Sequence, residues 1–110
     1  MKGSALLMAV CGALALPVAQ AQSVDVSAAE ALAKKSGCMK CHSVSAKKEG
    51  PSFKDTAAKY KGKPDAEKAL TTFLTSNPKV KVDGKEEPHD APKTQDQAQI
   101  TNLVKYILSR

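Results

Sequence analysis

The stretch Cys38-Met39-Lys40-Cys41-His42 has the spacing Cys-x-x-Cys-His, the sequence form of covalent c-type haem attachment. Two thiols three positions apart on one tight turn can each bond the same edge of a haem, while the adjacent imidazole reaches the iron. The pattern therefore predicts one haem c per chain, attached through Cys38 and Cys41, with His42 as the proximal iron ligand.

Two other kinds of site share this pentapeptide: half of a zinc site and a thioredoxin-like dithiol. Zinc needs four ligands. Beyond residue 21, the two thiols and His42 are joined by only one other His or Cys, His89, which lacks the paired spacing of zinc fingers or ribbons. A redox Cys-x-x-Cys usually opens a helix after a β-strand, and no apolar strand precedes Cys38. Both alternatives fit less well than haem attachment.

The N-terminus has the pattern of a secretory signal. Lys2 precedes an apolar run over residues 5–16, and the small-x-small site Ala19-Gln20-Ala21 follows it. The apolar run is too short to span a bilayer. We expect a signal peptide over residues 1–21 that is cleaved after export to the periplasm, and one domain over residues 22–110 with no membrane span.

The composition of the mature chain limits its core. It has 89 residues, and only four are aromatic: Phe53, Tyr60, Phe73 and Tyr106. A chain of this size buries little surface by itself, so a large apolar macrocycle at the centre would supply the missing core. Cys11 falls inside the predicted leader, which leaves no disulfide to replace that core.

Basic residues outnumber acidic ones. Without Lys2, 16 Lys and Arg stand against 11 Asp and Glu, a formal charge of +5. An exported chain meets no nucleic acid, and no nucleic-acid-binding motif is present, so an acidic protein is the expected partner. Five lysines lie close to the haem motif in sequence, either as a solvated face or as a surface that steers such a partner: Lys34, Lys35, Lys40, Lys47 and Lys48.

Apolar residues at helical spacing, with start and stop signals, predict four short helices. They cover residues 28–36, 52 to near 62, 63–76 and 94 to the C-terminus. Two of the starts are predicted capping boxes, Ser27 with Glu30 and Thr94 with Gln97. The pattern breaks down between the third and fourth helices. Residues 79–84 alternate like a brief strand into a turn, whereas residues 86–92 carry too many charges and prolines for a regular element. We therefore expect one long, functional loop over residues 79–93.

Three segments, in order, resemble the small single-haem class I c-type cytochromes of bacterial periplasms. They are the haem motif, Gly50-Pro51-Ser52-Phe53-Lys54-Asp55 with Ala57-Ala58-Lys59-Tyr60, and Leu103-Val104-Lys105-Tyr106-Ile107-Leu108-Ser109. The resemblance implies an all-α fold around one low-spin haem. It also implies that the Pro51 carbonyl orients His42, where the sequence alone favours an ordinary Gly-Pro turn. Electron transfer through a partly exposed haem edge, and no enzymatic turnover, are the implied function.

The chain departs from this family at the distal ligand. Relatives carry a methionine in the loop before the last helix, but no methionine follows Met39, which is tied to the ring edge between the two cysteines. The only other imidazole of the chain, His89, lies near the position of the family methionine. We expect His89 to be the distal ligand, giving a bis-histidine haem of low potential. The rivals are an open site or a lysine of the same loop: Lys79, Lys81, Lys85 or Lys93.

Two classes of function follow from these alternatives. If both axial sites are filled, the protein is an electron carrier, as a free shuttle or as a subunit of an oxidoreductase. If the distal site is open or exchangeable, the protein is a sensor or an enzyme that binds a gas or peroxide. The chain has a single arginine, the terminal Arg110, and no second distal histidine, so the sequence favours the carrier.

Overall fold

The computed structural model describes residues 3, 12–13, 15 and 23–110. The predicted signal peptide and its cleavage site lie almost entirely outside these residues. Within them, the chain forms four α-helices, one 3₁₀ turn and one antiparallel hairpin. In order, these are α1 (Val26–Lys35), η1 (Cys38–Lys40), α2 (Phe53–Tyr60), α3 (Ala66–Thr75), β1 (Lys79–Val82), β2 (Lys85–Pro88) and α4 (Gln97–Leu108).

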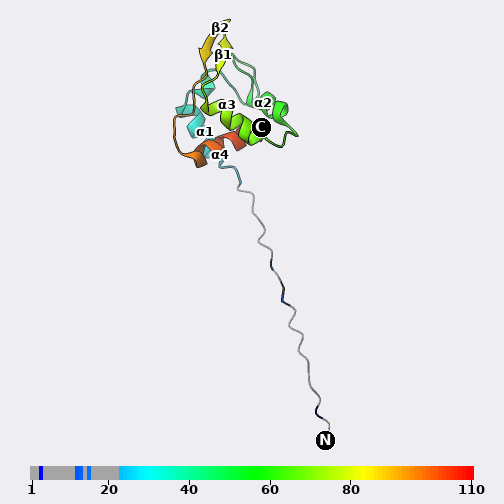
Figure 1. Ribbon diagram of the computed structural model, residues 1–110. Coiled ribbons are helices and arrows are strands. Elements are labelled where there is room, and N and C mark those ends of the chain that lie inside the picture. The colour runs from blue at the N-terminus through cyan, green and yellow to red at the C-terminus, as the bar shows by residue number, and fades with distance from the viewer. Residues whose placement is uncertain (1–2, 4–11, 14, 16–22) are drawn as a thin grey trace.

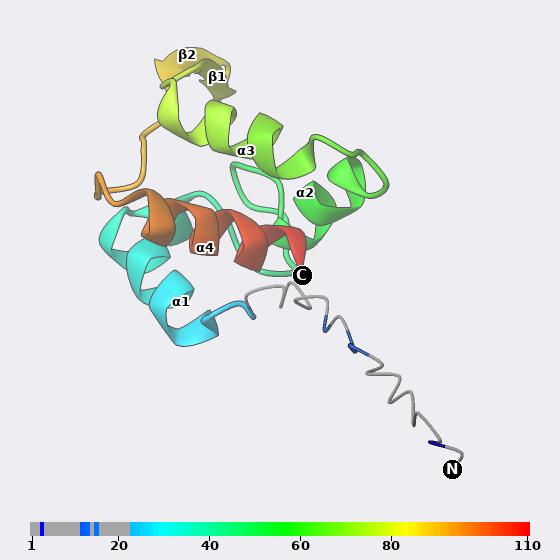
Figure 2. The same ribbon diagram turned by 60° about the horizontal axis from the view of Figure 1, so that its bottom comes forward.

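Helix α4 is the centre of the fold, and it packs against α1, α2 and α3 (Figures 1 and 2). Its apolar residues recur at positions i, i+3, i+4 and i+7, so they form one stripe. Ile100, Leu103, Val104 and Ile107 of this stripe are all buried. The remainder of the core comes from the other helices: Ala29, Leu32, Ala33, Phe53, Leu70 and Leu74. The predicted last helix and its apolar stripe are confirmed.

The first helix begins two residues earlier than the predicted capping box, which is wrong. Asp25 is the N-cap, and its carboxylate accepts from the Ala28 N–H at 3.0 Å. The Asn102 side chain of α4 holds the Asp25 backbone by two hydrogen bonds of 2.9 and 2.8 Å. Glu30, the other half of the predicted box, instead accepts from the Tyr106 hydroxyl at 3.3 Å. A contact with a helix 77 residues away therefore sets this start.

The second predicted capping box, Thr94 with Gln97, is also wrong. Asp96 caps α4 and accepts from the Ala98 N–H at 2.9 Å. The Thr94 hydroxyl accepts from the Asp96 N–H at 3.1 Å, so Thr94 shapes the turn before the cap. Aspartate is preferred over threonine as an N-cap, so the prediction gave too much weight to the capping-box spacing of Thr94 and Gln97.

The single long loop predicted for residues 79–93 is wrong as well, because its first half is a hairpin. Asp83 and Gly84 have φ values of 49° and 78°, as a two-residue type I′ turn requires. This turn matches the twist of the flanking strands and pairs Val82 with Lys85 and Lys79 with Pro88. Pro88 is tolerated because β2 is an edge strand of a two-stranded sheet. Figure 1 shows the hairpin at the edge of the helical layer, next to the end of α3.

Candidate haem site

The two motif cysteines and His42 lie on one tight turn directly after α1. Gly37 ends the helix in the left-handed region, with φ 75°, and the chain then turns through η1. The N–H groups of Cys41 and His42 both donate to the Cys38 carbonyl, at 3.2 and 3.0 Å. Both thiols are free and half-buried. One turn therefore carries two thiols and an imidazole side by side, as covalent attachment at a haem edge requires.

The His42 ring is oriented by Pro51. The Nδ1–H donates to the Pro51 carbonyl at 2.7 Å, which is the contact that the resemblance implies. Because a carbonyl oxygen only accepts, the proton lies on Nδ1 and Nε2 keeps its lone pair. Metal-bound histidines usually have this arrangement. The His42 Nε2 atom is therefore free to bind a metal.

Two further residues fix the plane of the same ring. A Cβ atom at Gly50 would stand 2.8 Å from the His42 Nδ1 atom, 3.1 Å from Nε2 and closer still to Cε1. The Gly50 N–H donates to the Cys41 carbonyl at 2.8 Å, which anchors this backbone against the motif. Phe53 stacks on the imidazole, with ring centroids 5.8 Å apart. The sequence analysis identified the Gly-Pro turn but not the need for a residue without a side chain at position 50.

His89 comes to lie opposite His42, although the two are far apart in sequence. The two ring centroids are 6.0 Å apart, with an interplanar angle of 49°. His89 directly follows β2, and its N–H donates to the Pro78 carbonyl at 2.8 Å, which extends the hairpin by one pair. Phe73 of α3 makes an edge contact with the His89 ring at 5.2 Å. The hairpin and the end of α3 thus place the second imidazole.

The two imidazoles fit a metal held between them. Metal–imidazole bonds are about 2 Å long, so two ligating rings on opposite sides of one ion have centroids about 6 Å apart. The His89 Nδ1 atom is buried without a hydrogen-bond partner, which is unusual for a buried polar atom. Burial, with a contribution from nearby His42, lowers the pKa of His89. The neutral form, which binds metals, is therefore favoured.

The donor set suits a haem better than zinc or dithiol chemistry. Two imidazoles are too few for a four-ligand zinc site but are the axial number for a porphyrin iron. Among the described residues, no three His, Cys, Asp or Glu side chains gather as they would around a metal ion. Burial raises the pKa of Cys38, and a hydrogen bond from the Cys41 thiol to Glu49 raises that of Cys41. Reactive dithiols need the opposite shift.

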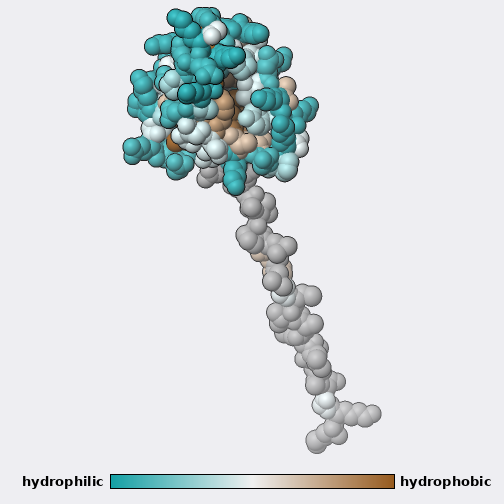
Figure 3. Space-filling view, turned by 45° about the horizontal axis from the view of Figure 1, so that its top comes forward, coloured by the Kyte–Doolittle hydropathy of each residue, from teal (hydrophilic) through white to brown (hydrophobic). Residues whose placement is uncertain are grey.

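The other predicted residues are either exposed or packed against the core. The four loop lysines that were rivals for the distal position all have exposed side chains: Lys79, Lys81, Lys85 and Lys93. Met39 is half-buried and packs against the core cluster. The lysines near the motif are all exposed, and Lys48 donates to the Met39 carbonyl at 2.8 Å. On the face drawn in Figure 3, an apolar strip lies between hydrophilic rims.

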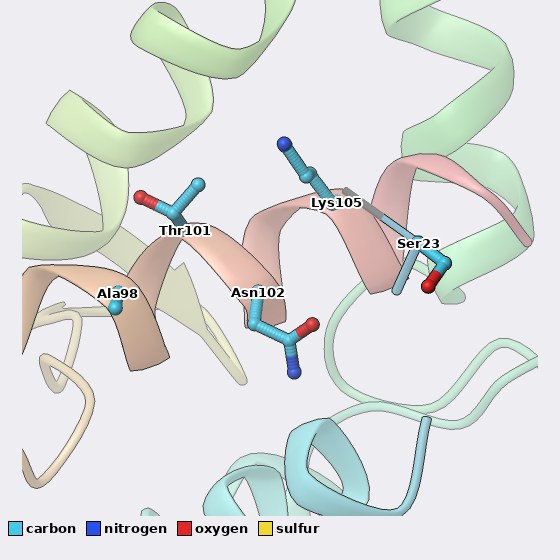
Figure 4. Close-up of a pocket in the computed structure, with 5 residues that line it drawn as sticks. All are labelled: Ser23, Ala98, Thr101, Asn102 and Lys105. Atoms are coloured by element: carbon cyan, nitrogen blue, oxygen red, sulfur yellow. The ribbon is translucent and has the colours of Figure 1, made fainter. Parts of the chain in front are cut away.

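A separate depression of about 190 Å³ lies away from both histidines, on the side of α4 that faces Ser23 (Figure 4). Asn102, which lines it, uses its amide to hold the Asp25 backbone. Its other lining residues are Ala98, Thr101 and Lys105.

No helix in the described part of the chain has the length and apolar character needed to cross a membrane.

Comparison with known proteins agrees with this geometry. The family model for cytochrome c matches residues 26–110. Cytochrome c-552 of Hydrogenobacter thermophilus is 44% identical over 61 residues, and cytochrome c-551 of Pseudomonas aeruginosa is 39% identical over 62 residues. Each match covers 56% of this chain, and the chain spans 53% and 60% of these relatives, little more than half of their length.

Solved structures cover more of the chain. The crystal structure of the class 1 cytochrome MtoD from Sideroxydans lithotrophicus ES-1 has 47% sequence identity and a TM-score of 0.75, covering 79% of this chain and 97% of that one. Cytochrome c552 of Nitrosomonas europaea has 32% identity and a TM-score of 0.56, covering 73% and 96%. The hairpin is an addition to an otherwise helical fold, and the expected class I fold is confirmed. The chain belongs to the cytochrome c family, in which one haem c is bound covalently, and its Cys38 and Cys41 fit the attachment motif.

Proposed function

We propose that this protein transfers electrons through a single haem c bound between His42 and His89, at a lower potential than methionine-ligated cytochromes c. The opposed imidazoles, with centroids 6.0 Å apart, carry the proposal. When bound, the haem supplies a one-electron iron couple. His42 on the attachment turn and His89 after the hairpin would hold the haem iron between them, so the chain itself would supply both protein ligands. Such a site has no vacancy for a substrate, which favours a carrier over an enzyme.

The chain's own residues hold this site rigid. The Pro51 carbonyl accepts from the His42 Nδ1–H and so orients the ring, and Gly50 and Phe53 fix its plane. A rigid site suits electron transfer, because the ligands then move little when the iron changes its oxidation state. His89 is half-buried, whereas the loop lysines are exposed, and this difference supports His89 as the distal ligand.

Partner and location belong to the same proposal. The exposed lysines beside the attachment turn suit an acidic redox protein, which they would steer towards the haem edge. We propose export to the periplasm through residues 1–21, because haem is attached outside the cytoplasm in this family. Whether the protein works as a free shuttle or within an oxidoreductase depends on that partner.

Carbon monoxide binding to the reduced holoprotein tests the ligand assignment. With His89 bound, the ferrous spectrum should stay unchanged on mixing, and His89→Ala should form the carbon monoxide adduct rapidly. His89→Met should raise the reduction potential, since a thioether favours ferrous iron more than an imidazole does. An Ala variant with an unchanged low-spin spectrum would exclude His89 as the ligand. Rapid adduct formation by the unaltered protein would instead favour the gas- or peroxide-binding alternative.

A further inference from the structure

The end of α3 has a feature that helix termination alone does not explain. Asn77 follows the helix in the left-handed region, with φ 49°. Glycine is the usual residue there, because a side chain makes this conformation costly, and asparagine is an accepted alternative. The Asn77 amide does not cap its own helix. Its Nδ2 donates instead to the His89 carbonyl at 3.0 Å, across 12 positions of sequence.

Pro78, which follows Asn77, pairs with the backbone N–H of His89. The Pro78 carbonyl accepts from the His89 N–H at 2.8 Å. Both backbone hydrogen-bonding groups of His89 are therefore paired with two consecutive residues at the end of α3. One turn earlier in that helix, Phe73 lies against the His89 ring with centroids 5.2 Å apart. Main chain and side chain of His89 are thus both attached to α3.

The hairpin brings the chain back to the end of α3, so that His89 lies beside Pro78. Residues 79–88 leave the end of α3, reverse at Asp83 and Gly84, and return to position 89 beside Pro78. Beyond His89 the chain runs on to Lys93, whose N–H donates to the buried Ser36 hydroxyl at 2.9 Å. Asn77 is the one side chain in the described structure that makes a hydrogen bond to His89, and its donor is the part that a glycine would lack.

We propose that Asn77 is a positioning residue that holds His89 in place for binding to the haem iron. The inference rests on the proposed function, since it takes His89 as the distal ligand. The Asn77 amide fixes the His89 carbonyl, and with Pro78 it sets the direction in which the imidazole leaves the backbone. Without that amide, one main-chain hydrogen bond and the Phe73 contact remain, and the ligand leaves the iron more often.

The experiment uses the holoprotein with Asn77→Gly. Glycine keeps the left-handed backbone at no steric cost and removes only the amide. The reduced variant should bind carbon monoxide about two- to tenfold faster than the unaltered protein, the factor that one neutral hydrogen bond supports. Its resting spectrum should remain low-spin. Asn77→Asp, which keeps the side-chain shape but lacks the donor, should show an increase of at least the same size.

Asp83→Gly is the matched control. Asp83 is the other non-glycine residue of the described chain with positive φ, also 49°, and it lies at the hairpin tip away from His89. This variant tests the added freedom of a glycine in the same hairpin, and its carbon monoxide kinetics should match those of the unaltered protein. An equal acceleration in Asp83→Gly and Asn77→Gly would overturn the role of the amide.

The His89→Ala background separates this inference from the proposed function. There, Asn77→Gly should add nothing to the rate of carbon monoxide binding, because the ligand that it positions is gone. A further acceleration would show general loosening and would overturn the inference. If His89→Ala opens the site while Asn77→Gly and Asn77→Asp bind carbon monoxide as slowly as the unaltered protein, Asn77 has no positioning role. If His89→Ala itself leaves carbon monoxide binding unchanged, His89 is not the distal ligand, and both the proposed function and this inference are overturned.

Discussion

Around His42, three different kinds of contact act on one imidazole. A carbonyl oxygen sets which nitrogen carries the proton, an aromatic ring packs on one side, and a residue without a side chain leaves room for the ring. The Gly50 N–H also donates a hydrogen bond to the Cys41 carbonyl, which restrains the backbone from moving away from the His42 ring to make room for a side chain. Position 50 is therefore sensitive to the smallest possible substitution.

We expect Gly50→Ala to displace the His42 ring and to change the haem spectrum. The added methyl group would overlap the ring, and overpacking of this kind costs about 1–3 kcal/mol of unfolding free energy. The visible spectrum and reduction potential of the holoprotein, together with denaturant unfolding, measure both effects.

Gly62→Ala provides the control for Gly50→Ala. Gly62 has φ 77°, and a methyl group added there would have no neighbour within 4 Å, so an alanine suffers backbone strain but no collision. That strain costs about 1–2 kcal/mol. Both variants should therefore lose stability, but only Gly50→Ala should alter the spectrum. The same spectral change in both would rule out a specific contact between position 50 and His42.

Among the elements, α4 has the largest structural role, because α1, α2 and α3 all pack on it. Its stripe places Leu103 and Val104 at the centre of the core, each 1% exposed, and Tyr106 joins α4 to α1 through Glu30. The hairpin plays a different part. Its strands are short and mostly exposed, and its importance lies in where it places His89.

Leu103→Ala should lower the unfolding free energy by about 2–5 kcal/mol, through lost apolar burial and the cavity left behind. Thr101→Ala, at an exposed position of the same helix, should change it by no more than about 0.5 kcal/mol. Denaturant unfolding of the holoprotein gives both values. Equal losses in the two variants would contradict the central position of Leu103.

At the scale of the whole molecule, the position of each lysine determines how strongly it can attract an anionic partner. The chain is basic overall, and we expect lysines near the attachment turn to raise the local concentration of an anionic partner at the haem edge more than distant ones do. Lys34, Lys35, Lys40, Lys47 and Lys48 are all exposed there. Steering by such a group acts through solvent and is screened over about 10 Å at 0.1 M salt.

Electron transfer from the reduced protein to anionic hexacyanoferrate(III) should therefore slow as salt rises. Lys40→Glu and Lys47→Glu should slow it further at low salt, because each reverses a charge beside the attachment turn. Lys105→Glu, which makes the same change of net charge beside the depression in Figure 4, should have a smaller effect. Stopped-flow rates over a salt series measure this. Equal slowing in all three variants would reduce the lysines to a contribution to net charge.

Several features follow from the sequence alone, because they depend on residues close together in the chain. The Cys38–His42 spacing predicts the attachment turn, and the stripe from Ile100 to Ile107 predicts α4. The absence of a methionine beyond Met39 directs attention to His89. The hairpin was also within reach of the sequence, since Asp83-Gly84 after an alternating run is a strong turn signal. The prolines and charges of residues 86–92 argued against a second strand, so the sequence analysis predicted a loop.

Other features depend on contacts between distant residues. Asp25 is the cap of α1 because Asn102 holds its backbone, and Gly50 is needed because the His42 ring lies against it. The 6.0 Å between His42 and His89 depends on the hairpin, Asn77 and Pro78 together. Local propensity and periodicity describe neighbours along the chain, so they identified the two histidines separately. Only the packing of α3 and its hairpin against the rest of the fold decided that the two imidazoles face each other.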